Sequence, residues 1–269
     1  MQLPVAIFNG DGRSEMVSSS SVVGMRKLFE SHTNGFSVDE VHCYQLNDLF
    51  GNCKSASPTI FVMPGGIPTL WDTVVDWEMR RKLRGFIESG NFGFFVCAGA
   101  YYGARSSCFR KGPKQIIAKE RGLDFFPGSA LGPKFPVTDT FQDARAVEII
   151  WEETQERGHA YLYQGGHFEP DPSAQEGVDY HVLARYADDN TIAVVRCPVG
   201  KGAVIMSFLH FEFHELPDGI VHHYMHEPSW RKFIDSKAFI KRCIGKLLAH
   251  LRVNDVAMES LAMGSVSSL

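Results

Sequence analysis

The sequence predicts an α/β fold in which helices cover both faces of an open, mostly parallel central sheet, with antiparallel strands added in the C-terminal half. In the N-terminal half, short apolar runs alternate with segments of helical periodicity, which is typical of strand–helix–strand units. In the C-terminal half, strand-like runs are separated by turns such as Asp188-Asp189-Asn190, which favour antiparallel pairing. No internal repeat or clear linker interrupts the chain, so a single domain is expected over residues 1–253. Residues 254–269 lack a sustained apolar face and are expected to form a disordered tail.

The N-terminal half contains four predicted strands and two well-marked helices. The strands are expected at Val5–Phe8, Val38–Tyr44, Thr59–Met63 and Phe92–Val96. One helix follows the serine run at 18–21 and is expected to end near Asn34-Gly35. The other spans Glu78–Ser89 and stops at Gly90. Open sheets of this kind bind ligands at the carboxyl ends of their strands.

The C-terminal half reads as a series of short strands followed by one long helix. The strands are expected at Val147–Trp151, Ala160–Tyr163, Tyr180–Tyr186, Thr191–Arg196 and Ala203–Phe208. Apolar residues at helical spacing then predict a closing helix over Phe233–Leu251.

Composition narrows the classes of protein to which the chain can belong. The 269 residues carry a net charge of −4, whereas a nucleic-acid-binding protein needs a dense basic face. Six cysteines without a CxxC pair indicate reduced thiols in a cytoplasmic compartment. No window approaches the ~18 apolar residues of a membrane span, and the N-terminus lacks the basic flank of a signal peptide. Neither nucleic acid nor membrane is expected as a partner.

Cys97 stands where the buried strand Phe92–Val96 ends and a helix begins at Ala98-Gly99-Ala100. A strand–Cys–helix junction directs the sulfur outward at the carboxyl end of the sheet, as in a nucleophile elbow. The N–H groups of the helix N-terminus favour the thiolate. The alternative is that Cys97 is simply a buried core residue, which is common for free cysteine.

His210 and Glu212 follow directly on the strand Ala203–Phe208, so they are expected at the same rim as Cys97. A thiol needs a base, and the base needs a third group that fixes its tautomer, so the three side chains form a candidate catalytic triad. Gly65 and Gly66 of Pro64-Gly65-Gly66 offer backbone N–H groups that, with the N–H of Ala98, suit an oxyanion hole.

Weaker signals surround this constellation. Asn9 and Asp11 are candidates for the substrate pocket, because their loop follows a strand that ends at the same rim. Gly166 and His167 are further candidates, with a simple β-turn as the alternative. The crowded histidines, among them His222, His223 and His226, lack tidy metal-ligand spacing and a cysteine partner, so no metal site is expected there. No cofactor is expected either.

Several motifs resemble class I glutamine amidotransferases and, more closely, the amidotransferase-like N-terminal domain of biotin–protein ligases. They lie between about residues 4 and 213 and include Asn9-Gly10-Asp11-Gly12, Phe61-Val62-Met63-Pro64-Gly65-Gly66, Cys97-Ala98-Gly99-Ala100-Tyr101-Tyr102, Leu123-Asp124-Phe125-Phe126-Pro127-Gly128 and Tyr163-Gln164-Gly165-Gly166. The resemblance implies a flavodoxin-like three-layer α/β/α fold with Cys97 as nucleophile, His210 as base and Glu212 as orienting acid. Two positions depart from the family pattern: Phe95 replaces the usual Gly two residues before the Cys, and Phe211 replaces the Pro of His-Pro-Glu.

Together these features predict a cysteine-dependent amidase or amidotransferase-like hydrolase that acts on a small-molecule amide or acyl substrate through a thioester. Two alternatives stay open. One is a non-catalytic binding or regulatory module with a protein partner, and the other is a redox-sensing thiol protein. The chain lacks the adenylate-loop and Lys-Trp-Pro-type stretches of the ligase, so it is not expected to attach biotin by itself.

Overall fold

The computed structural model describes residues 2–11, 16–31, 35–51, 57–111, 115–120, 122–137, 143–215 and 227–252. The described strands are β1 Leu3–Phe8, β2 Phe36–Val41, β3 Ile60–Met63, β4 Phe92–Val96, β5 Ala104–Lys111, β6 Gln115–Glu120, β7 Phe126–Gly132, β8 Ala144–Trp151, β9 Glu156–Tyr163, β10 His167–Pro170, β11 His181–Tyr186, β12 Ile192–Val199 and β13 Gly202–Ser207. The helices are α1 Ser19–Ser31, α2 Leu46–Gly51, α3 Pro68–Trp71, α4 Trp77–Glu88, α5 Ala98–Gly103, α7 Glu227–Asp235 and α8 Lys237–His250, with 3-10 turns η1 Cys43–Gln45 and η3 Phe211–Glu215. The predicted tail lies outside the described residues. None of the described helices is long and apolar enough to cross a bilayer.

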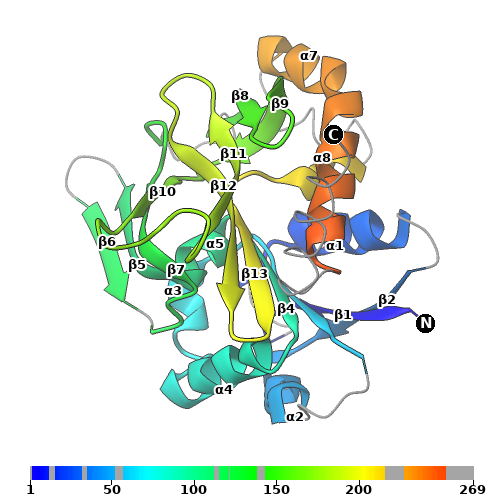
Figure 1. Cartoon of the computed structure of the whole chain (residues 1–269), viewed down its shortest axis with the longest axis vertical. Coiled ribbons are helices and arrows are strands. Elements are labelled where there is room, and N and C mark those ends of the chain that lie inside the picture. The colour runs from blue at the N-terminus through cyan, green and yellow to red at the C-terminus, as the bar shows by residue number, and fades with distance from the viewer. Residues whose placement is uncertain are drawn as a thin grey trace, which may run out of the picture.

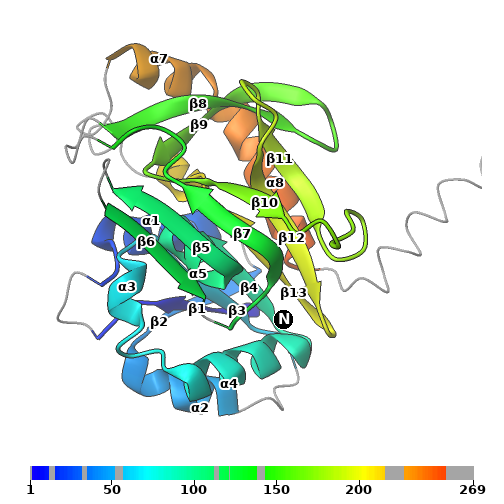
Figure 2. The same ribbon diagram turned by 90° about the vertical axis from the view of Figure 1, so that its left-hand side faces the viewer.

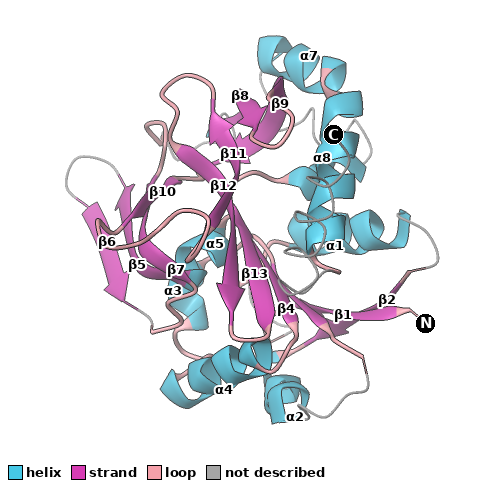
Figure 3. Ribbon diagram, in the orientation of Figure 1, coloured by secondary structure: helices cyan, strands magenta, loops and turns pink. Residues whose placement is uncertain are grey.

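The sheet begins with five parallel strands in the order β2-β1-β3-β4-β13 (Figures 1 and 3). This part is the flavodoxin-like α/β fold that the alternation of strands and helices predicts. Beyond β13 the sheet becomes mixed, and β12, β10, β7, β5 and β6 continue it. The hairpin β8–β9 joins through β11 and stands next to α7 and α8 (Figure 2).

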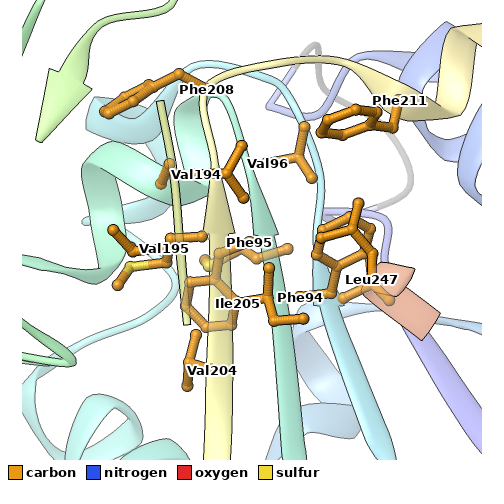
Figure 4. Close-up of a cluster of buried hydrophobic side chains, with 14 of the residues drawn as sticks. Phe94, Phe95, Val96, Val194, Val195, Val204, Ile205, Phe208, Phe211 and Leu247 are labelled. Atoms are coloured by element: carbon orange, nitrogen blue, oxygen red, sulfur yellow. The ribbon is translucent and has the colours of Figure 1, made fainter. Parts of the chain in front are cut away.

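Aromatic side chains on β4 show how the two faces of the sheet are covered. Successive residues of a strand point to opposite faces, and Phe94 and Phe95 do so here. Phe94 packs edge-on against Phe29 of α1, with ring centroids 6.4 Å apart. Phe95 packs on the other face, 6.2 Å from Phe61, which in turn contacts Phe50 of α2. Figure 4 shows this core, in which Leu247 of α8 lies beside Phe94.

The long closing helix predicted over Phe233–Leu251 is two helices, α7 and α8, which meet at Ser236. The reason is a tertiary contact, since the Ser236 hydroxyl accepts a hydrogen bond from the N–H of His159 at 2.9 Å. The helix after Cys97 is also short, because the chain turns at Ala104 into β5 and forms the unpredicted β5–β6 hairpin.

Candidate functional site

Cys97 occupies a strained backbone position between β4 and α5. Its φ of 52° and ψ of −104° lie in a region that residues other than glycine rarely adopt. Its N–H donates to the Ser207 carbonyl at 2.7 Å, and its carbonyl accepts from Tyr101 N–H at 3.1 Å. These two hydrogen bonds, to β13 and to α5, fix the backbone conformation of Cys97. Gly99 permits the tight approach of α5 to β3, because a Cβ there would lie 2.3 Å from the Met63 carbonyl oxygen.

His210 and Glu212 form a buried hydrogen-bonded pair immediately after β13. The His210 Nδ1 and Glu212 Oε1 atoms are 2.7 Å apart, and neither residue is more than 4% exposed. The turn η3 brings Glu212 back beneath the ring. The His210 ring stacks on Phe213 with centroids 4.8 Å apart and meets Tyr161 edge-on. These contacts hold the imidazole in one orientation.

The free edge of β9 brings Cys97 and His210 together. On its other side β9 pairs with β8. The Tyr161 carbonyl accepts from His210 N–H at 2.9 Å, and the Tyr163 carbonyl oxygen lies 3.6 Å from Cys97 Sγ. Carbonyl groups two residues apart on a strand are separated by about 6.6 Å, so the thiol and the histidine stand next to each other along this edge.

The charge state of His210 depends on both of its neighbours. Burial lowers the pKa of His210, but the Glu212 carboxylate and Cys97 together outweigh it and raise the pKa to about 10. The Nε2 atom is buried and has no hydrogen-bond partner among the described residues. Because Nδ1 is bonded to Glu212, Nε2 is the ring atom left to exchange a proton with the sulfur.

Ser21 is hydrogen-bonded to the candidate triad, a contact that sequence reasoning missed. This fully buried serine of α1 donates to Glu212 Oε1 at 2.7 Å and accepts from Gly65 N–H at 3.1 Å. A serine near a helix start predicts only a helix cap. A usable signal was Gly24, since a glycine inside a helix indicates close packing: a Cβ there would lie 2.9 Å from Glu212 Cγ.

The predicted oxyanion donors have different surroundings. Gly65 abuts the site, since a Cβ on it would lie 3.1 Å from His210 Cε1, but its N–H is engaged by Ser21. Gly66 forms an isolated β-bridge with Val17. The hydrogen bonds of this bridge are donated by Ser18 and Ile67, so they do not use the N–H of Gly66. Ala98 directly follows Cys97 at the first position of α5. The Gly65 N–H thus already has an acceptor, whereas Gly66 and Ala98 stay candidate donors.

The remaining predicted pocket residues divide into two groups. Gly166 packs against Tyr101 of α5: a Cβ on it would be 2.7 Å from the Tyr101 hydroxyl, and its carbonyl accepts from the Tyr186 hydroxyl at 2.7 Å. His167 is half-buried, and the charged groups that act on it are Lys134, Asp189 and Glu169 instead of the triad.

Asn9 and Asp11 lie at the end of β1. The side-chain amide of Asn9 donates to Glu40 of β2 at 2.8 Å, so it ties two strands together. Asp11 is half-buried on the following turn.

Both departures from the family motif are accommodated by packing. Phe95 is fully buried and fits beside Gly103, where a Cβ would lie 2.9 Å from its ring. Phe211 is 1% exposed and meets Trp151 edge-on, with ring centroids 6.5 Å apart. Neither phenylalanine displaces a member of the triad.

The described ranges contain no group of three or more His, Cys, Asp or Glu side chains that could hold a metal ion. His222, His223 and His226, whose spacing predicts no metal site, lie outside those ranges. The five cysteines in the described ranges, Cys43, Cys97, Cys108, Cys197 and Cys243, are free thiols.

Comparisons with known proteins agree with this geometry at the level of fold and family. The family described as "Biotin-protein ligase, N terminal" matches residues 3–263. A biotin–protein ligase of Schizosaccharomyces pombe is 31% identical over 167 residues, which is 59% of this chain and 26% of that protein. An uncharacterized protein of Chlamydia muridarum is 24% identical over 57% of this chain and 60% of that protein. The chain thus spans about a quarter of the ligase and less than two thirds of the second relative.

Among solved structures, a glutamine amidotransferase superimposes with a TM-score of 0.52 at 16% identity, covering 82% of this chain and 96% of that one. At this identity the likeness concerns the fold alone.

Proposed function

The chain belongs to the biotin–protein ligase N-terminal family, and from this membership and the surroundings of Cys97 we propose that it is a cysteine-dependent amidase or amidotransferase-like hydrolase. The substrate is a small-molecule amide or related acyl compound. The observation that carries the proposal is the buried His210 Nε2 atom, which has no hydrogen-bond partner in the described part of the chain and whose pKa is raised by Glu212 and Cys97 against the effect of burial.

The proposed reaction begins with a proton on His210 and a thiolate on Cys97. The thiolate attacks the amide carbon, and the carbonyl electron pair moves onto the oxygen to give a tetrahedral oxyanion. The N–H groups of Ala98 and Gly66 stabilise that oxyanion. His210 then gives its Nε2 proton to the leaving nitrogen, the C–N bond breaks, and a thioester and an amine remain.

Hydrolysis of the thioester restores the enzyme. Neutral His210 takes a proton from water, the hydroxide attacks the thioester carbon, and the carboxylic acid leaves as the C–S bond breaks. Glu212 keeps the Nδ1 proton in place throughout, so Nε2 is the atom that accepts and donates.

The test is a panel of primary amides, glutamine included, assayed for ammonia release with the wild-type protein, with Cys97→Ala and with Cys43→Ala. Cys43 is a half-buried free thiol and serves as the matched control. We expect Cys97→Ala to lose on the order of 10³-fold or more of any turnover while Cys43→Ala keeps it. Full activity in a folded Cys97→Ala protein would remove Cys97 from the mechanism.

One contact favours the second candidate, a binding or regulatory module of the same fold without chemistry. The Tyr163 carbonyl oxygen, 3.6 Å from Cys97 Sγ, accepts a hydrogen bond only from a protonated thiol. Alkylation by iodoacetamide at neutral pH, mapped by mass spectrometry, separates the candidates. A catalytic Cys97 labels much faster than Cys43, and a module in which Tyr163 holds the S–H group labels both at similar rates.

A further inference from the structure

Within the described residues, the strand β8 lacks a second neighbouring strand along residues 144–148. Its partner β9 pairs with all of Ala144–Trp151, but β11 pairs only with Ile149, Ile150 and Trp151. Along residues 144–148, therefore, β8 has a neighbouring strand on one side only within the described structure. An unpaired strand edge is a template for another chain.

The register shows which backbone groups face the open side. The carbonyl groups of Tyr161 and Tyr163 point away from β8, toward His210 and Cys97. In an antiparallel pair, opposite residues direct their backbone groups either both inward or both outward, so their partners Ala146 and Ala144 point away from β9. Glu148, two residues after Ala146, also directs its backbone groups away from β9, because its carbonyl accepts from Ala187 N–H on that side at 3.0 Å. In the described structure Ala144 and Ala146 have no backbone partner there.

Beside this edge lies a half-open cavity of about 500 Å³, which we call the β8 groove. Its floor is the segment 144–148, and its walls are Phe135, the Ala187–Asp188 turn, and Ser229 and Lys232 of α7. This volume lies within the usual range for ligand sites. Room next to an unpaired strand edge suits an added strand, which pairs at a spacing of about 4.8 Å.

Two cationic side chains of the β8 groove, Arg145 and Lys232, suit an acidic occupant, although the whole chain carries a net charge of −4. The Arg145 guanidinium lies over the Phe135 ring, 4.5 Å from the ring centroid. This stacking uses the face of the guanidinium and leaves the N–H groups at its edge able to bind a carboxylate. Neither Arg145 nor Lys232 has a carboxylate partner among the described residues. Asp188 shares Lys134 with Asp189, at 3.1 and 2.6 Å, so it is offset in part, and Glu148 is the other acidic side chain of the lining.

We propose that the β8 groove binds an extended peptide segment with acidic side chains, which adds to β8 as a strand. The backbone groups of Ala144 and Ala146 supply the hydrogen bonds, as in other peptide sites formed by strand addition. Alternate peptide side chains face Arg145, whose fork accepts a carboxylate in bidentate fashion. The partner is thus an acidic, extended stretch of another protein. This assignment is independent of the proposed hydrolase activity.

The test uses fluorescent heptapeptides that alternate valine with glutamate, serine or lysine, measured by anisotropy. We expect binding in the order glutamate, serine, lysine, weaker at higher salt. A glutamate peptide N-methylated at alternate residues is expected to lose ~10-fold or more in affinity, because its backbone donors are blocked. Ala146→Pro removes the outward N–H without touching the β9 ladder and is expected to lose a similar amount.

Arg145→Met is expected to weaken the glutamate peptide about fivefold and to flatten its salt dependence. Arg157→Met, which removes an exposed arginine of β9 outside the β8 groove, is the matched control and should bind as wild type. Equal binding of the N-methylated peptide, or no binding by any peptide, overturns the proposal. Self-association of the wild-type chain that Ala146→Pro abolishes would identify a second copy as the occupant and overturn it as well.

Discussion

Replacing Ser21 by alanine tests the four-residue network that holds Glu212. In the described part of the chain, the Ser21 hydroxyl and His210 Nδ1 are the two donors to the Glu212 carboxylate, and both bind Oε1. The other carboxylate oxygen, Oε2, is buried and has no hydrogen-bond partner among the described residues. The substitution therefore leaves the buried charge with His210 alone and also takes the acceptor from Gly65 N–H.

The expected cost follows from these two losses. A hydrogen bond to a buried charge contributes about 1.5–3 kcal/mol, and an orphaned buried N–H costs about 1–3 kcal/mol, so partial relaxation leaves a loss of about 3 kcal/mol in the free energy of unfolding. A chain of this size then melts about 6–12 °C lower. With its second donor gone, the Glu212–His210 pair also holds its proton more tightly, so the pKa of His210 rises further and proton donation slows.

The measurement is urea unfolding followed by circular dichroism, with Ser19→Ala as the matched control. Ser19 is exposed at the start of the same helix, so its substitution is expected to change stability by less than about 0.5 kcal/mol. If Ser21→Ala unfolds at the same urea concentration as Ser19→Ala, the hydroxyl does not support the carboxylate and the reasoning fails.

Two further substitutions follow from the same contacts. Glu212→Gln removes one of the two neighbours that raise the pKa of His210 and leaves burial, which lowers it, and Cys97, which raises it, so the pKa should fall from about 10, as followed by imidazole NMR signals. In the wild type, the pKa of His210 is raised from 6.5 to about 10, so its contribution to the free energy of unfolding is complete below pH 6.5 and is lost as the pH rises through 10. Glu212→Gln should therefore flatten this alkaline loss of stability. An unchanged dependence of stability on pH would contradict the role given to Glu212. Gly99→Ala forces a Cβ against the Met63 carbonyl at 2.3 Å and should cost more than about 2 kcal/mol, whereas Gly85→Ala, with open space around its Cβ in α4, should stabilise by up to about 1 kcal/mol. Similar melting temperatures for the two variants would show that α5 can move away from β3.

The centre of the parallel half was predictable because β3, β4 and β13 are buried on both faces. Phe92–Val96 reads as an unbroken apolar run, and β4 has those bounds. The β5–β6 hairpin was missed because Arg105 to Lys111 is mostly polar and shows no alternation that marks a strand. The break at Ser236 was missed because it depends on a hydrogen bond to His159 of β9, 77 positions away in sequence. The helical periodicity of the sequence carries no information about such a distant contact.

The candidate site shows the same division between local and distant information. Cys97 and the His210–Glu212 pair carry local signals, a strand end followed by a helix and a His-x-Glu motif, so they could be named in advance. Ser21 could not, since its role arises from a hydrogen bond across 191 positions. The contact of Tyr163 with Cys97 was equally invisible, because it uses a backbone carbonyl that any residue could supply.

The β8–β9 hairpin connects the candidate active site to the β8 groove. One edge of β9 presents the Tyr161 and Tyr163 carbonyls to His210 and Cys97, and the outer edge of β8 presents Ala144 and Ala146 to the groove. A peptide added to β8 would extend this hairpin to three strands and make it more rigid, and the carbonyl beside the thiol would be held more firmly. Because that carbonyl favours the protonated thiol, a bound glutamate heptapeptide should slow the alkylation of Cys97 in the wild type but not in Ala146→Pro. Slowing of equal size in both proteins would mean that the peptide reaches the thiol directly, without the β8 edge.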